Sequence, residues 1–512
     1  MDATQTGRTI LGHPRGLAVL FLTEMWERFS YYGMRALLIF YLTRHFLFGD
    51  EPAYGIFAAY TSMVYIAPIL GGFVADRWLG FRRSVLIGGI LIMLGHFGMA
   101  FEGAAATADA AGAVVRDGAA LQVMYFSLAL IIVGTGLLKA NISSIVGSLY
   151  EEGDRRRDGG FTIFYMGINI GAALAPLLCG WLGETYGWSY GFGAAGIGML
   201  LGLVVFSLGR SWLEGRGEAP DPAALERPVI AGLTVQHLVI GGCVLSLFPA
   251  WLLVQNSDVV GGALGIVGGL AIFAVIVYAA AKLEPVARDR ILAILILLPF
   301  HSLFWAFFEQ TGTSIALFAE RGVELSLFGM ALVPSQIQAI NPICIIVFAP
   351  IVAALWLWLD KRGREPNIPF KFAIGLFQMG LGFLMFFFGI MLAGEGEKVG
   401  FLWLVLGYLL HSTGELCISP VGLSAVTKLS IARITGLMMG VWFLSNAFAN
   451  YGAGLIAMTS SIEHMPGEGV SVAEALPIYG GMFWSVAWVA VASSVVLLLL
   501  SPLLKRLMHG VR

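Results

Sequence analysis

The sequence predicts an all-α polytopic membrane protein, with two bundles of six helices and two further helices inserted between the bundles. Its 512 residues are 58% hydrophobic and only 12% charged, with a mean hydropathy of +0.84, which is too apolar for an ordinary soluble protein. Apolar stretches of about 20 residues recur along the chain, and helices of that length cross a bilayer, whereas barrel strands are about half as long. Basic residues also gather in alternate loops, as they do in polytopic helical proteins.

The apolar stretches predict fourteen membrane-spanning helices. They cover residues 17–43, 54–75, 83–101, 122–147, 160–181, 189–209, 229–254, 259–282, 291–318, 335–358, 370–392, 399–426, 433–458 and 478–504. If the N-terminus is cytoplasmic and every span crosses, most of the basic residues lie in cytoplasmic segments. The opposite side then holds only Arg44, Arg116, Arg321 and Lys398, and the spans hold Arg28, Arg35 and Lys139. This asymmetry predicts that both termini are cytoplasmic.

Two charge-rich loops suggest how the helices are organised. The loop from Asp76 to Arg83 follows the second span, and a shorter counterpart from Asp360 to Arg364 follows a later one. If these loops are equivalent, two spans are an insertion between six-helix bundles and face lipid. The predicted domains are an N-terminal bundle (1–209), a cytoplasmic linker rich in Pro and Gly (210–228), two inserted helices (229–282) and a C-terminal bundle (283–512).

The first span carries charged side chains where lipid would penalise them. Positions that step by four, four and three place Glu24, Arg28, Tyr32 and Arg35 on one helical face, with Glu27 and Tyr31 beside them. Charge at membrane depth marks function by default, so this face is expected to line water. The guanidinium groups of Arg28 and Arg35 suit a substrate carboxylate, which they can bind with two hydrogen bonds. The alternative is an internal salt bridge that merely orders the bundle.

Lys139 lies in the fourth span and has no acidic residue near it in the sequence. A buried ammonium group needs a partner, so we expect Glu24 or Glu27 to pair with it, and protonation of that acid would release the lysine. The alternative is a lysine that extends to the nearby cytoplasmic interface.

The second bundle contributes acids without a nearby base, Glu309 and Glu415. With three cations in one bundle and two acids in the other, the protein could hold a zwitterion by both of its charged ends. Either acid could instead be a packing residue that is hydrogen-bonded to backbone. The amides of Asn169 and Asn341 could bind a ligand or simply bridge helices.

The remaining candidates are aromatic residues and histidines within spans. Tyr65, Trp305, Trp442 and Phe443 could form side-chain pockets, although aromatic residues in membrane helices usually pack. His96, His301 and His411 are expected to be structural rather than proton relays. No nucleotide-binding loop, HExxH motif or nucleophile elbow is present, so neither an ATP-driven pump nor a common hydrolase is indicated. We expect no cofactor, no metal and no nucleic-acid partner.

Together these residues resemble the proton-dependent oligopeptide transporter family, a branch of the major facilitator superfamily. The family pattern ExxERFxYYG matches Glu24 to Gly33. Further matches are Gly72 to Arg83 in the helix 2 to 3 region, Phe161 to Gly171 in the fifth helix, and Gly414-Glu415 with Ser419-Pro420 in the tenth core helix. Bacterial members also carry two extra helices between the bundles, which agrees with the fourteen predicted spans.

The resemblance implies proton-coupled uptake of di- and tripeptides by alternating access, in the inner membrane of a bacterium, by a monomer driven by the proton gradient. It places Arg28, Arg35 and Lys139 near the peptide carboxylate, and Glu415, Asn169 and Asn341 near its amino end. It assigns proton coupling to Glu24, Glu27 and Glu309, together with Arg28 and Lys139, and assigns the pocket lining to Tyr31, Tyr32, Tyr65 and Trp442. Animal members have a histidine in the second helix where this chain has Ala58, so coupling here would depend on carboxylates.

Two other functions remain open on the sequence. The same scaffold could carry another small anionic or zwitterionic solute, such as nitrate or a small metabolite. A membrane-embedded enzyme could use the carboxylates as acid and base, but the missing catalytic motifs argue against an enzyme.

Overall fold

The computed structural model describes residues 9–109, 112–151, 153–230, 232–431, 434–464 and 469–511. Its elements form two compact units, each described here by itself. Unit 1 comprises residues 1–41, 63–106 and 115–255, and unit 2 comprises residues 42–62, 107–114 and 256–512. The boundary divides the second long helix, α2 (Asp50–Val74), because its first half packs with unit 2 and its second half with unit 1.

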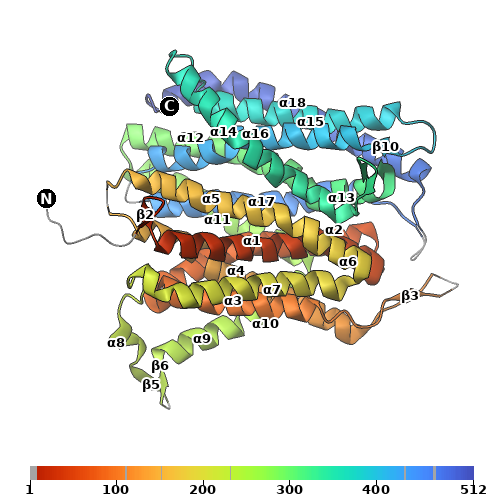
Figure 1. Ribbon diagram of the computed structural model, residues 1–512. Coiled ribbons are helices and arrows are strands. Elements are labelled where there is room, and N and C mark those ends of the chain that lie inside the picture. Colours follow the sequence, from red (N-terminus) through yellow and green to blue (C-terminus); the bar gives the residue numbers. More distant parts are fainter. Residues whose placement is uncertain are drawn as a thin grey trace. The chain divides into compact units, whose positions relative to one another are not determined.

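Unit 1 contains most of the earlier helices (Figure 1). They are α1 (Gly16–Phe40), α3 (Gly80–Met99), α4 (Gly118–Ser148), α5 (Arg156–Ala175), α6 (Trp181–Tyr186), α7 (Trp188–Leu208), α8 (Pro222–Leu225), α9 (Val235–Leu245) and α10 (Leu247–Val254). Single turns extend several of them: the π turns η2 (Ala75–Leu79) and η3 (Pro176–Gly180), and the 3₁₀ turn η4 (Gly209–Leu213).

Unit 2 contains the later helices and the π turn η1 (Tyr41–His45) that precedes α2. They are α11 (Ser257–Lys282), α12 (Pro285–Phe308), α13 (Ser314–Gly322), α14 (Ile340–Asp360), α15 (Ile368–Leu392), α16 (Phe401–Leu429), α17 (Thr435–Met458) and α18 (Val472–Leu507), with 3₁₀ turns η5 (Glu309–Gly312) and η6 (Pro334–Ala339).

The strands are two or three residues long and lie in the connections. They are β1 (Thr9–Ile10), β2 (His13–Pro14), β3 (Thr107–Ala108), β4 (Val114–Val115), β5 (Pro228–Ile230), β6 (Leu233–Thr234), β7 (Val323–Glu324), β8 (Ser326–Leu327), β9 (Met330–Ala331) and β10 (Val399–Gly400). The pairs β1–β2, β5–β6 and β8–β9 are antiparallel, and β7 pairs with β10 in parallel.

Every predicted membrane span falls on one of these helices or on a consecutive pair. Among the described residues, 11 helical stretches are long and apolar enough to cross a membrane, and the stretch Asp50–Met99 contains two predicted spans. The other two predicted spans fall on α1 and α17. Helix α1 is not among the 11 because its first-span motif carries several charged residues. Charged residues in a membrane-spanning helix are expected on a face that is turned away from lipid.

Helix α1 is held closely between α5 and α7, and the three run side by side in Figure 1. Glycines allow the close approach. A Cβ atom at Gly171 of α5 would lie 2.2 Å from the carbonyl oxygen of Met25, and one at Gly198 of α7 would lie 2.5 Å from the Phe29 ring. Small residues at helix contacts let backbones approach in membrane proteins, where packing rather than the hydrophobic effect joins helices. The charged face of α1 is thereby fixed in position.

The two inserted segments belong to different units: α9 and α10 to unit 1, and α11 to unit 2. In each, only 22% of the most apolar window is buried within the protein. Such exposed apolar surface is expected of helices that face lipid. The domain boundaries proposed from the sequence stay a prediction.

An ion pair at the start of α2 fixes this end of the helix to the rest of unit 2. The Arg321 guanidinium donates to both carboxylate oxygens of Asp50, each at 2.6 Å, and to the hydroxyl of Tyr479 at 3.0 Å. Asp50 also accepts from the backbone N–H of Ile462 at 3.1 Å. Asp50 is buried and the Arg321 side chain is 9% exposed, so the buried carboxylate depends on Arg321 for compensation.

Farther along α2, the helix meets α17 at very short range. A Cβ atom at Gly454 would lie 2.4 Å from Cβ of Ala58, and Ala58 itself is buried. A histidine at position 58 would have no room here, because its ring would enter the space that Gly454 leaves for the alanine. This contact gives a physical reason for the alanine that the sequence carries at this position.

Removal of the Arg321 charge should destabilise the protein strongly. Arg321→Ala leaves Asp50 buried without its partner, at an expected cost of about 3–5 kcal/mol. Arg44→Ala is a matched control, because the partner of Arg44, Glu320, is partly exposed and the pair should contribute about 1 kcal/mol or less. Thermal unfolding midpoints in detergent measure both. An equal fall of the unfolding midpoint in the two variants would show that the Asp50–Arg321 pair contributes no more to stability than the partly exposed Arg44–Glu320 pair.

Candidate functional site

The charged face of α1 is a closed network of buried ion pairs. The Arg28 guanidinium donates from Nε to Oε2 of Glu27 at 2.5 Å and from Nη2 to Oε1 at 2.8 Å. Its Nε also lies 3.2 Å from Oε1 of Glu24, one helical turn earlier. All three side chains are buried. The two acids differ, because both oxygens of Glu27 are held by Arg28, whereas Oε2 of Glu24 is buried and has no hydrogen-bond partner among the described residues.

Lys139 approaches this network from α4. Its Nζ lies 4.3 Å from the centroid of the Tyr65 ring on α2, and its charge is near enough to Glu24 to interact with it electrostatically. The second half of α2 and α4 come together because a Cβ at Gly71 would lie 2.0 Å from the carbonyl oxygen of Gly136. The structure therefore brings together Lys139, Glu24 and Tyr65, which are distant in the sequence.

The remaining first-span candidates continue the same helix. The guanidinium carbon of Arg28 lies 5.2 Å from the centroid of the Tyr31 ring, and the Tyr31 and Tyr32 rings meet edge to face at 5.2 Å. Arg35 is buried farther along α1. A guanidinium over an aromatic face gains a cation–π interaction, which is stronger away from water. Tyr31 therefore helps to hold the charged end of Arg28.

Asn169 forms its hydrogen bond within its own helix. Its amide Nδ2 donates to the carbonyl oxygen of Tyr165, one turn earlier in α5, at 3.0 Å. The side chain is 8% exposed and lies near the position where Gly171 packs on Arg28. Its role toward a ligand stays a prediction.

In unit 2, the span predicted as continuous over 291–318 is interrupted at Glu309. Helix α12 ends at Phe308, a 3₁₀ turn follows, and Thr313 has φ −129° and ψ −100° before α13 begins. The side chain of Gln310 compensates the break, because it donates to Ala306 and Ala453 carbonyl oxygens at 3.0 and 2.9 Å. Interrupted helices at membrane depth are tolerated where they border a cavity or are buried in protein, and they commonly form binding sites.

The second acid of unit 2, Glu415, has neutral hydrogen-bond partners only. Asn341 of α14 donates from Nδ2 to Oε2 of Glu415 at 3.0 Å and lies 3.0 Å from the Ser412 hydroxyl. Glu415 is buried and makes no ion pair within the part of the chain that is described. Glu309 is near enough to interact with it electrostatically. Two buried carboxyl groups thus interact, and Ser412, which nothing in the sequence singled out, contacts Asn341, the amide partner of Glu415.

Trp442 of α17 is buried against rings from other helices. It lies 4.1 Å from the His301 ring and 6.4 Å from the Phe372 ring, between centroids. Gly422 provides the space, since a Cβ there would lie 2.4 Å from the indole. Only 2% of Trp442 is exposed, so in this conformation it supports other rings rather than lining an open surface.

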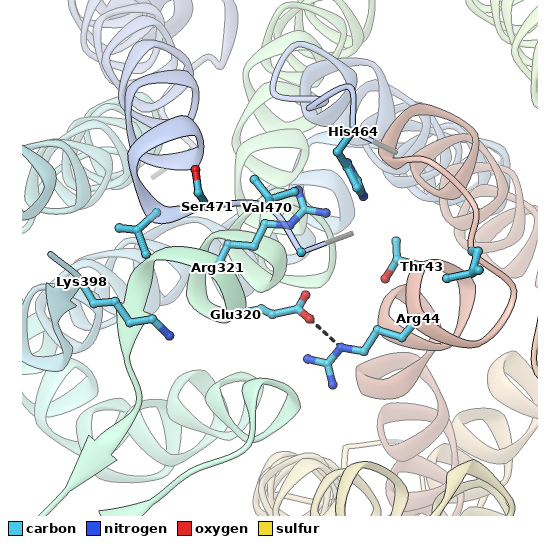
Figure 2. Close-up of a pocket in the computed structure, with 11 residues that line it drawn as sticks. Thr43, Arg44, Glu320, Arg321, Lys398, His464, Val470 and Ser471 are labelled. Carbon is cyan, nitrogen blue, oxygen red and sulfur yellow. Dashed lines mark hydrogen bonds and ion pairs between the residues drawn. The ribbon is translucent and has the colours of Figure 1, made fainter. Parts of the chain in front are cut away.

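A separate polar cavity of about 550 Å³ lies within unit 2 (Figure 2). It is lined by Thr43, Arg44, Leu47, Glu320, Arg321, Lys398, His464, Gly469, Val470, Ser471 and Val472. Three of its cations are among the four that the charge pattern places on the non-cytoplasmic side. Two of them are paired, Arg44 with Glu320 at 2.5 Å and Arg321 with Asp50 at 2.6 Å. The cavity is therefore a polar pocket of unit 2, and neither Glu309 nor Glu415 lines it.

The site residues thus form two sets with opposite chemistry. Unit 1 gathers guanidinium and ammonium groups with two acids, and unit 2 gathers two acids with neutral amide and hydroxyl partners. The first set can exchange internal ion pairs for bonds to an anionic group, and the second can bind a cationic group. The two sets therefore differ in the charge of the group that each can bind.

Comparison with known proteins identifies the family. A model of the POT family matches residues 82–468. The uncharacterized transporter YclF of Bacillus subtilis (strain 168) is 40% identical over 506 residues, which cover 98% of this chain and 96% of YclF. The peptide transporter YePEPT of Yersinia enterocolitica subsp. palearctica is 35% identical over 529 residues, which cover 99% of this chain and 98% of YePEPT.

A solved structure agrees over the whole length. The crystal structure of a variant peptide transporter POT in complex with alafosfalin has 38% sequence identity, a TM-score of 0.80 and coverage of 98% of both chains. The predicted fold class, an all-α membrane protein of the major facilitator fold, is thereby confirmed, and the family is one of transporters rather than enzymes. The chain belongs to the POT family of membrane transporters.

Proposed function

We propose that this protein imports di- and tripeptides together with protons, by alternating access across a bacterial inner membrane, as a monomer with both termini in the cytoplasm. The observation that carries the proposal is the opposite chemistry of the two sets of buried side chains. Relatives named peptide transporter and dipeptide and tripeptide permease support a peptide substrate.

The peptide carboxylate interacts with the cations of unit 1. Arg28 forms ion pairs with the carboxylates of Glu24 and Glu27, and a peptide carboxylate can replace one of them. Lys139 and Arg35 add charge of the same sign. The peptide ammonium interacts with Glu415, whose neutral partner Asn341 leaves its charge uncompensated. Recognition of the common termini lets the side chains vary.

Proton coupling follows from the unequal environments of the two acids on α1. Protonation of Glu27 would disrupt two short hydrogen bonds from Arg28, whereas Glu24 has a buried oxygen without a partner. Glu24 is therefore the acid whose protonation costs the fewest contacts. Loss of its charge weakens its attraction to Arg28 and Lys139, which become available to the peptide. A proton-motive force of about 200 mV would then support accumulation on the order of a thousandfold per proton.

The coupling carboxylates and their lysine should be necessary for concentrative uptake. Glu24→Gln, Glu27→Gln and Lys139→Ala are expected to abolish uptake of labelled dialanine driven by a pH step in proteoliposomes. Glu24→Gln should keep exchange of dialanine without a gradient, because the amide resembles the protonated acid. Glu395→Gln makes the same chemical change at an exposed loop residue and should transport normally. Concentrative uptake by both Glu27→Gln and Lys139→Ala would exclude this coupling scheme.

Glu415 should determine recognition of the free amino end. Glu415→Gln retains an acceptor for Asn341 but loses the charge, so the KM for dialanine should rise by about tenfold or more, as expected for loss of a charged hydrogen bond. Competition by N-acetyl-dialanine provides the specific measurement. The native protein should strongly prefer the free amine, and the variant should prefer it much less. An unchanged preference in the variant would place the ammonium elsewhere, and preferred competition by nitrate would favour a different solute.

A further inference from the structure

We propose that His301 is a positioning residue for the substrate pocket: in a fixed neutral form, it orients the indole of Trp305 and rests on the indole of Trp442. The inference extends the proposed function, since it concerns selection among peptides by their side chains. It stands on hydrogen bonds and ring contacts within unit 2.

Both ring nitrogens of His301 have partners. The indole Nε1–H of Trp305 donates to Nε2 of His301 at 2.9 Å, and Nδ1 lies 2.8 Å from the hydroxyl of Ser445. His301 itself is 2% exposed. Burial alone does not require such pairing: His96 is equally buried, and neither of its ring nitrogens has a hydrogen-bond partner among the described residues.

The partners determine the tautomer. An indole N–H can only donate, so Nε2 of His301 must be the unprotonated acceptor and Nδ1 must carry the proton. The Nδ1–H group then donates to the Ser445 hydroxyl, which in turn donates to the backbone carbonyl oxygen of Trp442 at 2.6 Å. The hydrogen bonds therefore run in one direction from α12 to α17, and the indole N–H, both imidazole nitrogens and the serine hydroxyl each have a partner. A chain of this kind holds one arrangement of the ring. A ring flip would replace both nitrogens by carbons and lose both hydrogen bonds, and the other neutral tautomer would place Nε2–H against the indole N–H.

His301 also connects the two tryptophans by packing. Its ring lies 4.1 Å from the Trp442 ring, at an interplanar angle of 40°. Trp442 is buried, whereas Trp305 is only partly buried. Of the two tryptophans, Trp305 is thus the one with solvent-accessible surface. His301 packs on the buried Trp442 ring and, through its hydrogen bond, restricts the orientation of Trp305.

The place of Trp305 connects this group to the predicted substrate site. Positions 301 and 305 share one face of α12, and the next residue at the same spacing is Glu309, at the helix break. An indole fixed one turn before this acid can form a wall for a peptide side chain. A wall that is already in place lowers the ordering cost of binding a large apolar side chain, and matters less for a methyl group.

Two conservative variants separate the two hydrogen bonds. His301→Gln places an amide near the former Nε2 and can still accept from Trp305. His301→Asn places its amide near the former Nδ1, so it can reach Ser445 but not the indole. We expect His301→Asn to raise the KM for alanyl-phenylalanine by about three- to tenfold relative to dialanine, with Vmax within about twofold of native, the effect of one neutral hydrogen bond. His301→Gln should keep the native ratio.

The same substitutions at His96, a buried histidine without a hydrogen-bond partner among the described residues, provide the control. His96→Gln and His96→Asn should leave the ratio of the two KM values unchanged, because that side chain has no partner to lose. Equal ratios in His301→Asn and His301→Gln, or a change in Vmax alone, would overturn the positioning role and leave His301 as a packing residue.

A spectroscopic measurement keeps the inference distinct from the proposed function. The contribution of Trp305 to near-ultraviolet circular dichroism is the difference between each protein and the same protein with Trp305→Phe. It should be retained in His301→Gln and largely lost in His301→Asn, and retention in both would contradict the inference. If the native protein takes up no dialanine, the proposed function fails, and this measurement still decides whether His301 orients Trp305.

Discussion

The buried ion pairs of Arg28 are the interaction on which the rest of the structure depends. Charges at membrane depth persist only when they neutralise one another or face water, because lipid offers them no hydrogen bonds. Arg28 meets this requirement because it contacts both carboxylate oxygens of Glu27 and one of Glu24. Helix α5 packs closely over this part of α1, because Gly171 has no side chain to collide with Met25 or with Cβ of Arg28. The ion pairs themselves form within α1 and are covered by this packing.

Unit 2 handles buried charge differently. Asp50 and Arg321 form a fully paired bridge that fixes the start of α2, whereas Glu415 has only an amide as partner. A paired charge has little reason to exchange partners, and an uncompensated one gains from any cation that reaches it. The contrast separates a structural ion pair from a candidate binding group within the same unit. It also explains why an abundance of buried charge does not by itself locate a site.

The sequence predicted the class of fold correctly, because that signal is local, and the roles of its candidate site residues stay predictions. The fourteen apolar stretches coincide with helices, and the step of four residues placed Glu24 and Arg28 in contact. The break at Glu309 was missed, because apolar periodicity continues through 291–318 and the turn depends on Gln310 bonds to another helix. Ser412 was missed because an isolated serine in an apolar helix carries no pattern. The roles of Asn169 and of the pocket aromatics stay predictions.

The sequence by itself determined that this protein spans a membrane and that one face of its first helix carries charge, because hydropathy and helical periodicity act over a few turns of one segment. Only the tertiary structure decided which charges meet. Lys139 reaches Tyr65, Asn341 reaches Glu415, and His301 lies between two tryptophans through contacts of residues far apart in the chain. Such contacts depend on how the helices pack. Glycines and helix breaks control this packing, and no single segment of the sequence specifies it.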